Sequence, residues 1–317
     1  MTMTPLVNVL SKFLKSSKFN TPTHSMITIA VYGSRRQGDK TPLVDTLLRS
    51  LSIHGCRLVL HSKIYSYLTE MLPGDPQQNW NVYTVTDSDR FSADLAVSLG
   101  GDGTLLRTAQ WVGDKEIPII GINTGHLGFM TAFELSDAEK IVDMLFRSKF
   151  SVENRTLISV STENAPRGWR NFALNEVAVL KHDTASMVSV KASLDNRPLA
   201  TYLADGLIVA TPTGSTGYNL SVGGPILQPT APNFVISPIA AHSLTMRPLV
   251  ISDQSCLELT TSSRSATFCV SIDGKPFTLP IDSSIKLKKA DFVTRIIQPL
   301  DHNFADALHD KLLWGER

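Results

Sequence analysis

The chain has 317 residues, long enough for two domains of ordinary size. Hydrophobic residues make up 42% of it and charged residues 19%, which is typical of folded globular proteins rather than of disordered chains. The 30 Lys and Arg residues nearly balance the 29 Asp and Glu residues, giving a formal charge of +1. Because nucleic-acid-binding surfaces usually carry a strong positive excess, we expect no nucleic-acid partner.

The sequence also argues against a membrane span, a disulfide framework and a zinc site. No apolar stretch approaches the roughly 18–20 residues that a membrane helix needs. Cys56, Cys256 and Cys269 form no CxxC pair, and the eight histidines show no paired metal spacing. We therefore expect a cytoplasmic protein with no membrane partner. Residues 1–25 carry three lysines and no acidic residue, and we interpret them as a flexible leader. A transit peptide, a surface-binding helix and a start at Met26 are the alternatives.

From residue 26 onward, strand-like apolar runs alternate with helical periodicity. This alternation predicts a Rossmann-like α/β domain with a parallel sheet over residues 26–149. The expected strands are residues 26–33, 56–60, 95–99 and 118–122, and the expected helices are residues 42–51, 64–71, 105–112 and 137–146.

The pattern changes near residue 150 to short alternating strands separated by turn residues, which predicts an all-β sandwich domain over residues 150–295. The expected strands are residues 156–162, 173–180, 188–194, 206–211, 257–261, 266–272 and 284–288. A last helical stretch, residues 304–313, lies in a C-terminal segment, residues 296–317. We expect that segment to pack back on the α/β domain.

The glycine-rich sequence after the strand at 95–99 is the strongest functional signal. Gly100, Gly101 and Gly103 let the backbone turn sharply and approach a ligand with no Cβ in the way. The amides of the following helix N-terminus, near Thr104, point outward with partial positive charge, so phosphate is the natural ligand. Asp102 could hold Mg²⁺ or accept a proton from an attacking hydroxyl. The structural alternative is a tight turn in which Asp102 or Thr104 caps the helix.

Two better-known nucleotide motifs are not matched. Residues 33–41 resemble a Walker A loop, but Asp39 stands between Gly38 and Lys40, where that loop needs lysine directly after its glycine. The dinucleotide fingerprint of dehydrogenases would need a glycine where the chain has Leu106. A P-loop site and a hydride-transfer enzyme are therefore both disfavoured.

Three further segments carry groups suited to nucleotides. Residues 205–221 are dense in Ser, Thr and Gly, whose hydroxyls and amides could bind sugar and phosphate oxygens, and Tyr218 could stack on a base. Asn175 and Glu176 lie in an expected strand, where the carboxylate could accept hydrogen bonds from two ribose hydroxyls. Residues 123–129 follow the strand at 118–122, where open α/β sheets place ligands. An Ω-loop, a surface pair and a structural His126 are the alternatives.

In this order, the four motifs resemble those of the NAD kinase family. They are Gly-Gly-Asp-Gly-Thr at 100–104, Asn-Thr-Gly-His-Leu-Gly-Phe at 123–129, Asn-Glu-Val at 175–177 and Thr-Pro-Thr-Gly-Ser-Thr-Gly-Tyr at 211–218. The first motif alone is shared with diacylglycerol-type lipid kinases. In those kinases Asn-Glu-Val follows almost at once, whereas here it lies much further along the chain.

The resemblance implies a kinase that transfers the γ-phosphoryl of ATP to the 2′-hydroxyl of the adenosine ribose of NAD⁺, giving NADP⁺. It implies that Asp102 accepts the hydroxyl proton, and that Mg²⁺ or another divalent metal sits on the nucleotide phosphates near Asp102. It also implies a homotetramer or homodimer, and a β-rich domain that binds NAD⁺. The residues that match family positions contacting NAD⁺ are Asp102, Gly103, Arg107, Phe129, Asn175, Glu176, Asp205, Thr216, Gly217, Tyr218, Asn219, Leu220, Ser221 and Ala240, with Phe129 bordering the adenine.

Three positions depart from the commoner family pattern. Ser186 and Leu203 stand where the family often has basic residues, or histidine at the first, and Lys275 stands where Gln or Asn is usual. The resemblance still places these three residues at family positions that contact NAD⁺. Two other functions remain open at this point: a lipid or sugar kinase that shares the glycine motif, and a module that binds NAD⁺ without turning it over.

Overall fold

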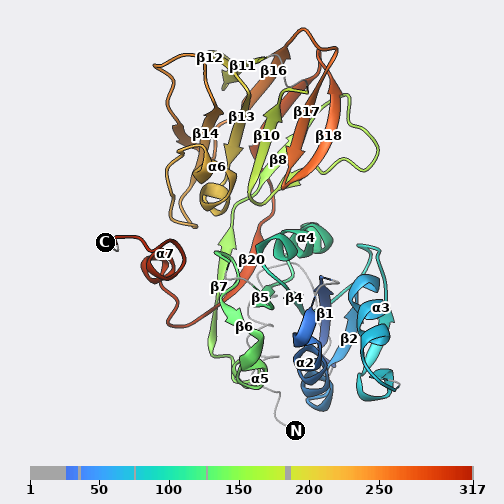
Figure 1. Ribbon diagram of the computed structural model, residues 1–317. Helices are drawn as coiled ribbons and strands as arrows, with labels where there is room; N and C mark the ends of the chain where they lie inside the picture. Colours follow the sequence, from blue (N-terminus) through green and yellow to red (C-terminus); the bar gives the residue numbers. More distant parts are fainter. Residues whose placement is uncertain (1–25, 35–36, 75, 126–127, 183–186, 316–317) are drawn as a thin grey trace. The chain divides into compact units, whose positions relative to one another are not determined.

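The computed structural model describes residues 26–34, 37–74, 76–125, 128–182 and 187–315 (Figure 1). The leader, His126 and Ser186 lie outside the described residues. The chain divides into two compact units, here called the α/β unit (Met1–Glu153 with Arg295–Arg317) and the β unit (Asn154–Thr294).

The α/β unit is built on an eight-stranded sheet whose strand order is β3-β2-β1-β4-β5-β20-β7, with β6 paired to β5. Strands β2, β1, β4, β5 and β20 pair in parallel in this order, so their carboxyl ends meet at one edge. The strand order reverses at β1/β4, which is where sheets of this kind bind ligands. The strands are β1 (Thr28–Gly33), β2 (Arg57–Leu60), β3 (Val82–Val85), β4 (Leu95–Leu99), β5 (Ile119–Asn123), β6 (Phe133–Glu134), β7 (Phe150–Arg155) and β20 (Thr294–Pro299).

Helices α2, α3, α4 and α5 cover this sheet because each carries an apolar stripe. The stripes of α2, α3 and α5 join the alternate residues of the strands in one core. Helix α4 packs on the opposite face, since a Cβ added at Gly121 of β5 would lie 2.7 Å from Leu105 of α4. The helices are α2 (Thr41–Ile53), α3 (Ser62–Met71), α4 (Asp102–Val112), α5 (Ala138–Phe146) and α7 (Phe304–Leu312), with short turns η1 (Gly38–Lys40), η2 (Pro76–Asn79), η3 (Gly113–Lys115) and η4 (Leu135–Asp137).

The β unit consists of two six-stranded sheets, in the orders β15-β14-β13-β10-β17-β18 and β12-β11-β16-β19-β8-β9, with antiparallel pairing throughout. One apolar core, which includes Phe268, draws on both sheets. The elements are β8 (Ile158–Ser161), β9 (Phe172–Ala173), β10 (Glu176–Leu180), β11 (Val188–Leu194), β12 (Arg197–Ala204), β13 (Gly206–Ala210), η5 (Thr213–Thr216), α6 (Tyr218–Ser221), β14 (Asn233–Ile239), β15 (Leu249–Ser252), β16 (Leu257–Ser262), β17 (Thr267–Ile272), β18 (Lys275–Pro280) and β19 (Ser284–Lys289).

The predicted fold class, a parallel α/β sheet followed by an all-β region, is confirmed. Several elements differ from the prediction. Strands β14, β18 and β20 contain prolines, which the sequence pattern treats as turn residues. Helix α4 begins at Asp102 rather than at Leu105, and the single strand expected over residues 173–180 is broken between β9 and β10. The strands that the sequence pattern did not predict are β3, β6, β7, β12, β14, β15, β18 and β20. Among the described residues, no helix is long and apolar enough to cross a membrane.

Candidate active site

The glycine-rich loop after β4 lies beside the loop after β5. The Gly100 amide donates a hydrogen bond of 3.0 Å to the Ile122 carbonyl of the neighbouring strand. Gly100 has a φ of +148°, and a Cβ there would overlap the side chain of Thr104. Glycine is therefore required for the chain to turn from β4 into α4.

Asp102 occupies the first turn of α4 and anchors the second loop. Its two carboxylate oxygens accept hydrogen bonds from the backbone amides of Phe129 (2.7 Å) and Met130 (2.9 Å). A Cβ at Gly128 would overlap this carboxylate, so the loop can approach only because residue 128 is glycine. An ionised carboxylate can accept about four hydrogen bonds. These two bonds therefore leave Asp102 able to accept a hydrogen bond from a further donor.

The other residues predicted in this unit gather near the N-terminus of α4. The Arg107 guanidinium donates to the Thr104 hydroxyl over 3.2 Å. Gly103 and Arg107 are exposed, whereas Thr104 is buried. Phe129 is half-buried, and the Lys311 ammonium of α7 lies 5.7 Å from its ring centroid. The structure thus brings together a basic side chain, an aromatic ring and a carboxylate around exposed backbone.

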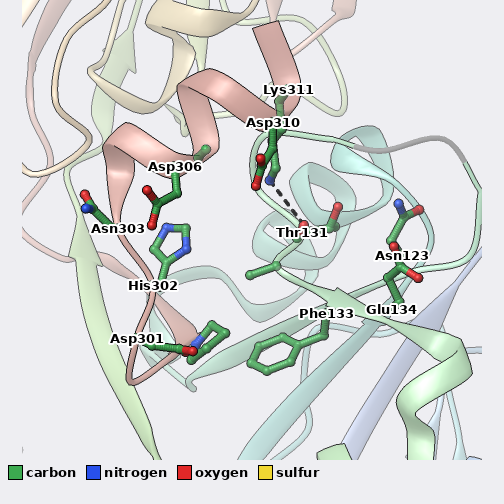
Figure 2. A pocket seen from close by; sticks show the side chains of 13 residues that line it. Asn123, Thr131, Phe133, Glu134, Asp301, His302, Asn303, Asp306, Asp310 and Lys311 are labelled. Carbon is green, nitrogen blue, oxygen red and sulfur yellow. Dashed lines mark hydrogen bonds between the residues drawn. The ribbon is translucent and has the colours of Figure 1, made fainter. Parts of the chain in front are cut away.

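A cavity of about 450 Å³ lies between α7 and the ends of β5 and β6 (Figure 2). Lys311 enters it from α7 and donates to the Thr131 carbonyl over 3.4 Å. Carboxylates on its wall (Glu134, Asp301, Asp306 and Asp310) make it a poor site for phosphate. Asn123, from the predicted nucleotide segment of residues 123–129, lines it, but none of the residues predicted individually to contact NAD⁺ is among the described lining residues.

Asn175 and Glu176 form a corner at the start of β10 in the β unit. Two of their oxygens, Asn175 Oδ1 and Glu176 Oε2, are buried without a hydrogen-bond partner. Burial and the nearby charge of Asp273 raise the pKa of Glu176 to about 7, and the Tyr218 amide opposes this rise by hydrogen bonding to the carboxylate. Buried acceptors without donors are costly, so this corner is suited to a ligand that supplies hydroxyl donors.

The glycine-rich loop of residues 211–217 lies directly on this corner. The Thr211 amide donates to the Asn175 carbonyl over 2.8 Å, and its hydroxyl donates to the Leu174 carbonyl over 2.5 Å. A Cβ at Gly214 would overlap the backbone of Asn175, and one at Gly217 would lie 3.3 Å from Glu176 Oε2. Glycine at both positions permits this close contact.

Asn219 is buried, and both amide hydrogens and one lone pair of its oxygen are used. Its Nδ2 donates to the carbonyls of Ser215 (3.1 Å) and Pro225 (3.0 Å), and its Oδ1 accepts from the Ser237 hydroxyl over 2.6 Å. These bonds hold the loop, so contact of its side chain with NAD⁺ stays a prediction.

The remaining predicted residues of the β unit lie nearer the surface. Asp205 is paired with Lys181 at 2.7 Å, and the Lys275 ammonium donates to the Gly168 carbonyl over 3.0 Å. The Thr216 hydroxyl donates to the Thr213 carbonyl over 3.4 Å. The exposed members of the predicted set are Leu203, Tyr218, Ser221, Ala240 and Lys275, while Asp205, Thr216, Gly217 and Leu220 are half-buried.

Sequence reasoning missed Asp273 as a functional residue. Its carboxylate accepts hydrogen bonds from the amides of Leu174 (2.8 Å), Asn175 (2.8 Å) and Glu176 (3.3 Å). The available signal was the Asp-Gly dipeptide between two alternating segments, which indicates a hairpin turn. That signal predicts the turn and says nothing of the distant amides.

The described residues hold no group of three or more His, Cys, Asp or Glu side chains that could bind a metal ion. Asp102 is a single carboxylate already holding two amides. Mg²⁺ is commonly held by nucleotide phosphates and water with few protein ligands, and the site at Asp102 fits an ion held in that way. It does not fit a metal held by protein side chains alone.

Comparison with known proteins matches two long segments of the chain to one enzyme family. Residues 36–150 match the model of the ATP-NAD kinase N-terminal domain, and residues 174–298 match that of the ATP-NAD kinase C-terminal domain. A protein of Porphyromonas gingivalis named NAD kinase is 41% identical over 290 residues, covering 92% of this chain and 99% of the relative. One of Bacteroides fragilis, also named NAD kinase, is 37% identical over 286 residues, covering 90% of this chain and 97% of the relative.

Two solved structures are similar over most of the chain. An NAD kinase from Archaeoglobus fulgidus in complex with ATP has a TM-score of 0.66 and 26% identity, covering 86% of this chain and 94% of that one. Yeast NADH kinase complexed with NADH has a TM-score of 0.82, covering 93% of this chain and 90% of that one. At 20% identity, the yeast enzyme supports the fold alone.

Proposed function

The chain belongs to the ATP-NAD kinase family, and from that premise we propose how its residues phosphorylate NAD⁺. It is an NAD kinase, which converts NAD⁺ to NADP⁺ with ATP. A lipid or sugar kinase and a non-catalytic NAD⁺ sensor are set aside, because both domains match this one enzyme family over most of the chain.

The two unpartnered acceptors of Asn175 and Glu176 are the observation that carries the binding proposal. A ribose presents neighbouring hydroxyl groups, each of which can donate one hydrogen bond. The Glu176 carboxylate accepts from these hydroxyls, and the Asn175 amide accepts and donates beside it. The further contacts proposed for NAD⁺ are Gly103, Arg107, Phe129, Asp205, Thr216, Gly217, Tyr218, Asn219, Leu220, Ser221 and Ala240, together with the three positions that depart from the family pattern, Ser186, Leu203 and Lys275.

Asp102 is the proposed acceptor of the proton that leaves the 2′-hydroxyl. Its carboxylate is held in place by the Phe129 and Met130 amides, which fixes its position without consuming all its lone pairs. The backbone of the half-buried Gly101 and the exposed Gly103, with the N-terminus of α4, receives phosphate oxygens. Mg²⁺ or another divalent metal, held on the ATP phosphates near Asp102, would neutralise part of their negative charge.

The function is tested by incubating the purified chain with ATP, MgCl₂ and NAD⁺ and measuring NADP⁺ with an NADP⁺-specific dehydrogenase. We expect NADP⁺ to accumulate in proportion to enzyme and to depend on both substrates. Absence of NADP⁺ with any divalent metal would refute the assignment. Parallel reactions with polyphosphate and with NADH define the donor and the acceptor.

Binding of NAD⁺ should strengthen as the pH rises through about 7, the pKa of Glu176. The ionised carboxylate accepts two hydroxyl donors, whereas the protonated form has lost acceptor capacity. The raised pKa also affects folding. The protonated Glu176 carboxyl stabilises the folded state fully below pH 4.5, its ordinary pKa, and this stabilisation is lost as the pH rises through about 7. Calorimetric titration with NAD⁺ between pH 6 and 8, without ATP, measures this dependence.

The Glu176→Gln variant is the control for that dependence. Glutamine keeps the shape of the side chain and removes its titration, so NAD⁺ affinity should fall by about tenfold at pH 8 and vary little between pH 6 and 8. A pH dependence that persists in this variant would assign the titration to another group.

We also propose a homotetramer or homodimer in the cytoplasm. The edge strand β15 exposes Leu249 and Val250, and Leu244 nearby is 89% exposed. Apolar side chains on a free strand edge favour pairing with another chain. The three cysteines, none of which forms a disulfide in the structure, are consistent with a reducing compartment.

A further inference from the structure

The turn between β17 and β18 places the Asp273 carboxylate within hydrogen-bond distance of backbone amides at the start of β10. Ile272 pairs with Lys275 across a turn of only Asp273 and Gly274, whose φ angles are +46° and +73°. Two consecutive positive φ values define the tight turn that matches the twist of a hairpin, and Asp-Gly or Asn-Gly is its preferred sequence. Asp273 is therefore suited to this turn before any second role is considered.

The Asp273 carboxylate accounts for the break in the strand between β9 and β10. It accepts the amides of Leu174, Asn175 and Glu176, which are consecutive residues. The Asp273 amide also donates to the Glu176 carbonyl over 3.1 Å. Three amides converging on one carboxylate cannot continue a regular ladder, in which they would point alternately to opposite sides. The corner takes its shape from this group.

We propose that Asp273 is a positioning residue for the kinase reaction, because its carboxylate holds the backbone that presents Asn175 Oδ1 and Glu176 Oε2 to NAD⁺. This inference rests on the proposed function of the corner. Asp273 acts through its neighbours and is only 9% exposed. Its role is distinct from that of a residue that touches the reacting atoms.

Asp273 also sets the charge environment of Glu176. Its negative charge is one cause of the raised pKa of Glu176. The other charged groups at this turn have their own partners: Lys275 bonds to the Gly168 carbonyl, and Arg170 bonds to the Ile272 carbonyl over 3.4 Å. Strand β13 and the loop of residues 211–218 have no charged residue. Removing the charge of Asp273 should therefore lower the pKa of Glu176.

The Asp273→Asn variant tests the proposal while preserving the turn, because asparagine is at least as suitable in this turn. Its amide oxygen can replace one carboxylate oxygen, but its NH₂ group would face an amide donor. We expect the KM for NAD⁺ to rise about tenfold, the effect of weakening one buried hydrogen-bond set. We expect kcat to stay within about threefold of the wild type, and the midpoint of NAD⁺ binding against pH to move to lower pH.

Asp195→Asn is the matched control. Asp195 and Asn196, with φ of +50° and +64°, form the corresponding turn between β11 and β12, where Leu194 pairs with Arg197. Its carboxylate accepts one distant amide, that of Cys256, over 2.8 Å. The substitution, the turn and the type of contact are the same, but the turn belongs to the other sheet. NAD⁺ kinetics and the pH midpoint should match those of the wild type.

The outcomes separate the proposal from a purely structural role. A raised KM with a lowered pH midpoint in Asp273→Asn alone supports it. Wild-type kinetics and midpoint, a fall in kcat at unchanged KM, or unfolding of Asp273→Asn would each overturn it, the last by reducing Asp273 to a support of the hairpin. Failure of the wild-type chain to make NADP⁺ would instead refute the underlying function, so the two failures are distinguishable.

Discussion

Asp102→Asn should lower kcat by about 10²–10⁴-fold, the contribution typical of a positioned general base. Asparagine keeps the size of the side chain but cannot accept the hydroxyl proton. The structure adds a second effect, because Asp102 also holds the amides of Phe129 and Met130. The NH₂ group of asparagine would oppose one of these donors, so a moderate rise in the KM for NAD⁺ should accompany the loss of kcat. Steady-state kinetics with both substrates varied measures the two effects.

Asn123→Ala separates proton transfer from anchoring of the loop. Asn123 Oδ1 accepts the Gly125 amide over 2.9 Å at the start of the same loop, without contacting Asp102 in any described hydrogen bond. This variant should loosen the loop and raise the KM for NAD⁺ while leaving kcat near that of the wild type. If both variants lost kcat equally, Asp102 would be an anchor of the loop and the base would have to be sought elsewhere.

The fold class could be predicted from the sequence because the patterns that indicate it lie in short, continuous segments of the chain. Strand β4 and the glycines after it occupy consecutive positions, and the burial of all five residues of β4 matches an apolar run that only Ser98 interrupts. The parallel α/β class follows from such runs alternating with helical stripes. The strands missed by the prediction lack this signal: β3 has an exposed, alternating pattern, and β14 and β18 contain proline.

The contacts that shape the candidate site could not be derived from the sequence, because they join residues far apart in the chain. Gly128 is necessary because of Asp102, and Gly214 because of Asn175, yet nothing local marks either glycine as a contact rather than a turn. Asp273 reads as a hairpin residue, while its carboxylate serves amides near residue 175. Sequence motifs therefore predict candidate substrate-binding residues more readily than the residues that hold those candidates in place.

Gly214→Ala should reduce kcat/KM for NAD⁺ by about 100-fold or more, since a displacement of about 1 Å at a substrate-positioning group can have that effect. The added Cβ would overlap three backbone atoms of Asn175, the carbonyl oxygen, the carbonyl carbon and Cα, and none of these can rotate away as a side chain could. The hydrogen bond from the Thr211 amide to the same carbonyl oxygen would be strained as well. Overpacking of this kind should also lower the free energy of unfolding by about 1–3 kcal/mol.

Gly223→Ala distinguishes this overlap from general intolerance of the glycine-rich segment. Gly223 has a φ of +77°, but a Cβ there meets no atom within 4 Å. The variant should lose about 1 kcal/mol of stability through backbone strain and keep wild-type affinity for NAD⁺. Thermal unfolding and calorimetric titration of both variants measure the contrast. Equal losses of affinity would mean that flexibility of the whole segment, rather than the contact between residues 214 and 175, controls binding.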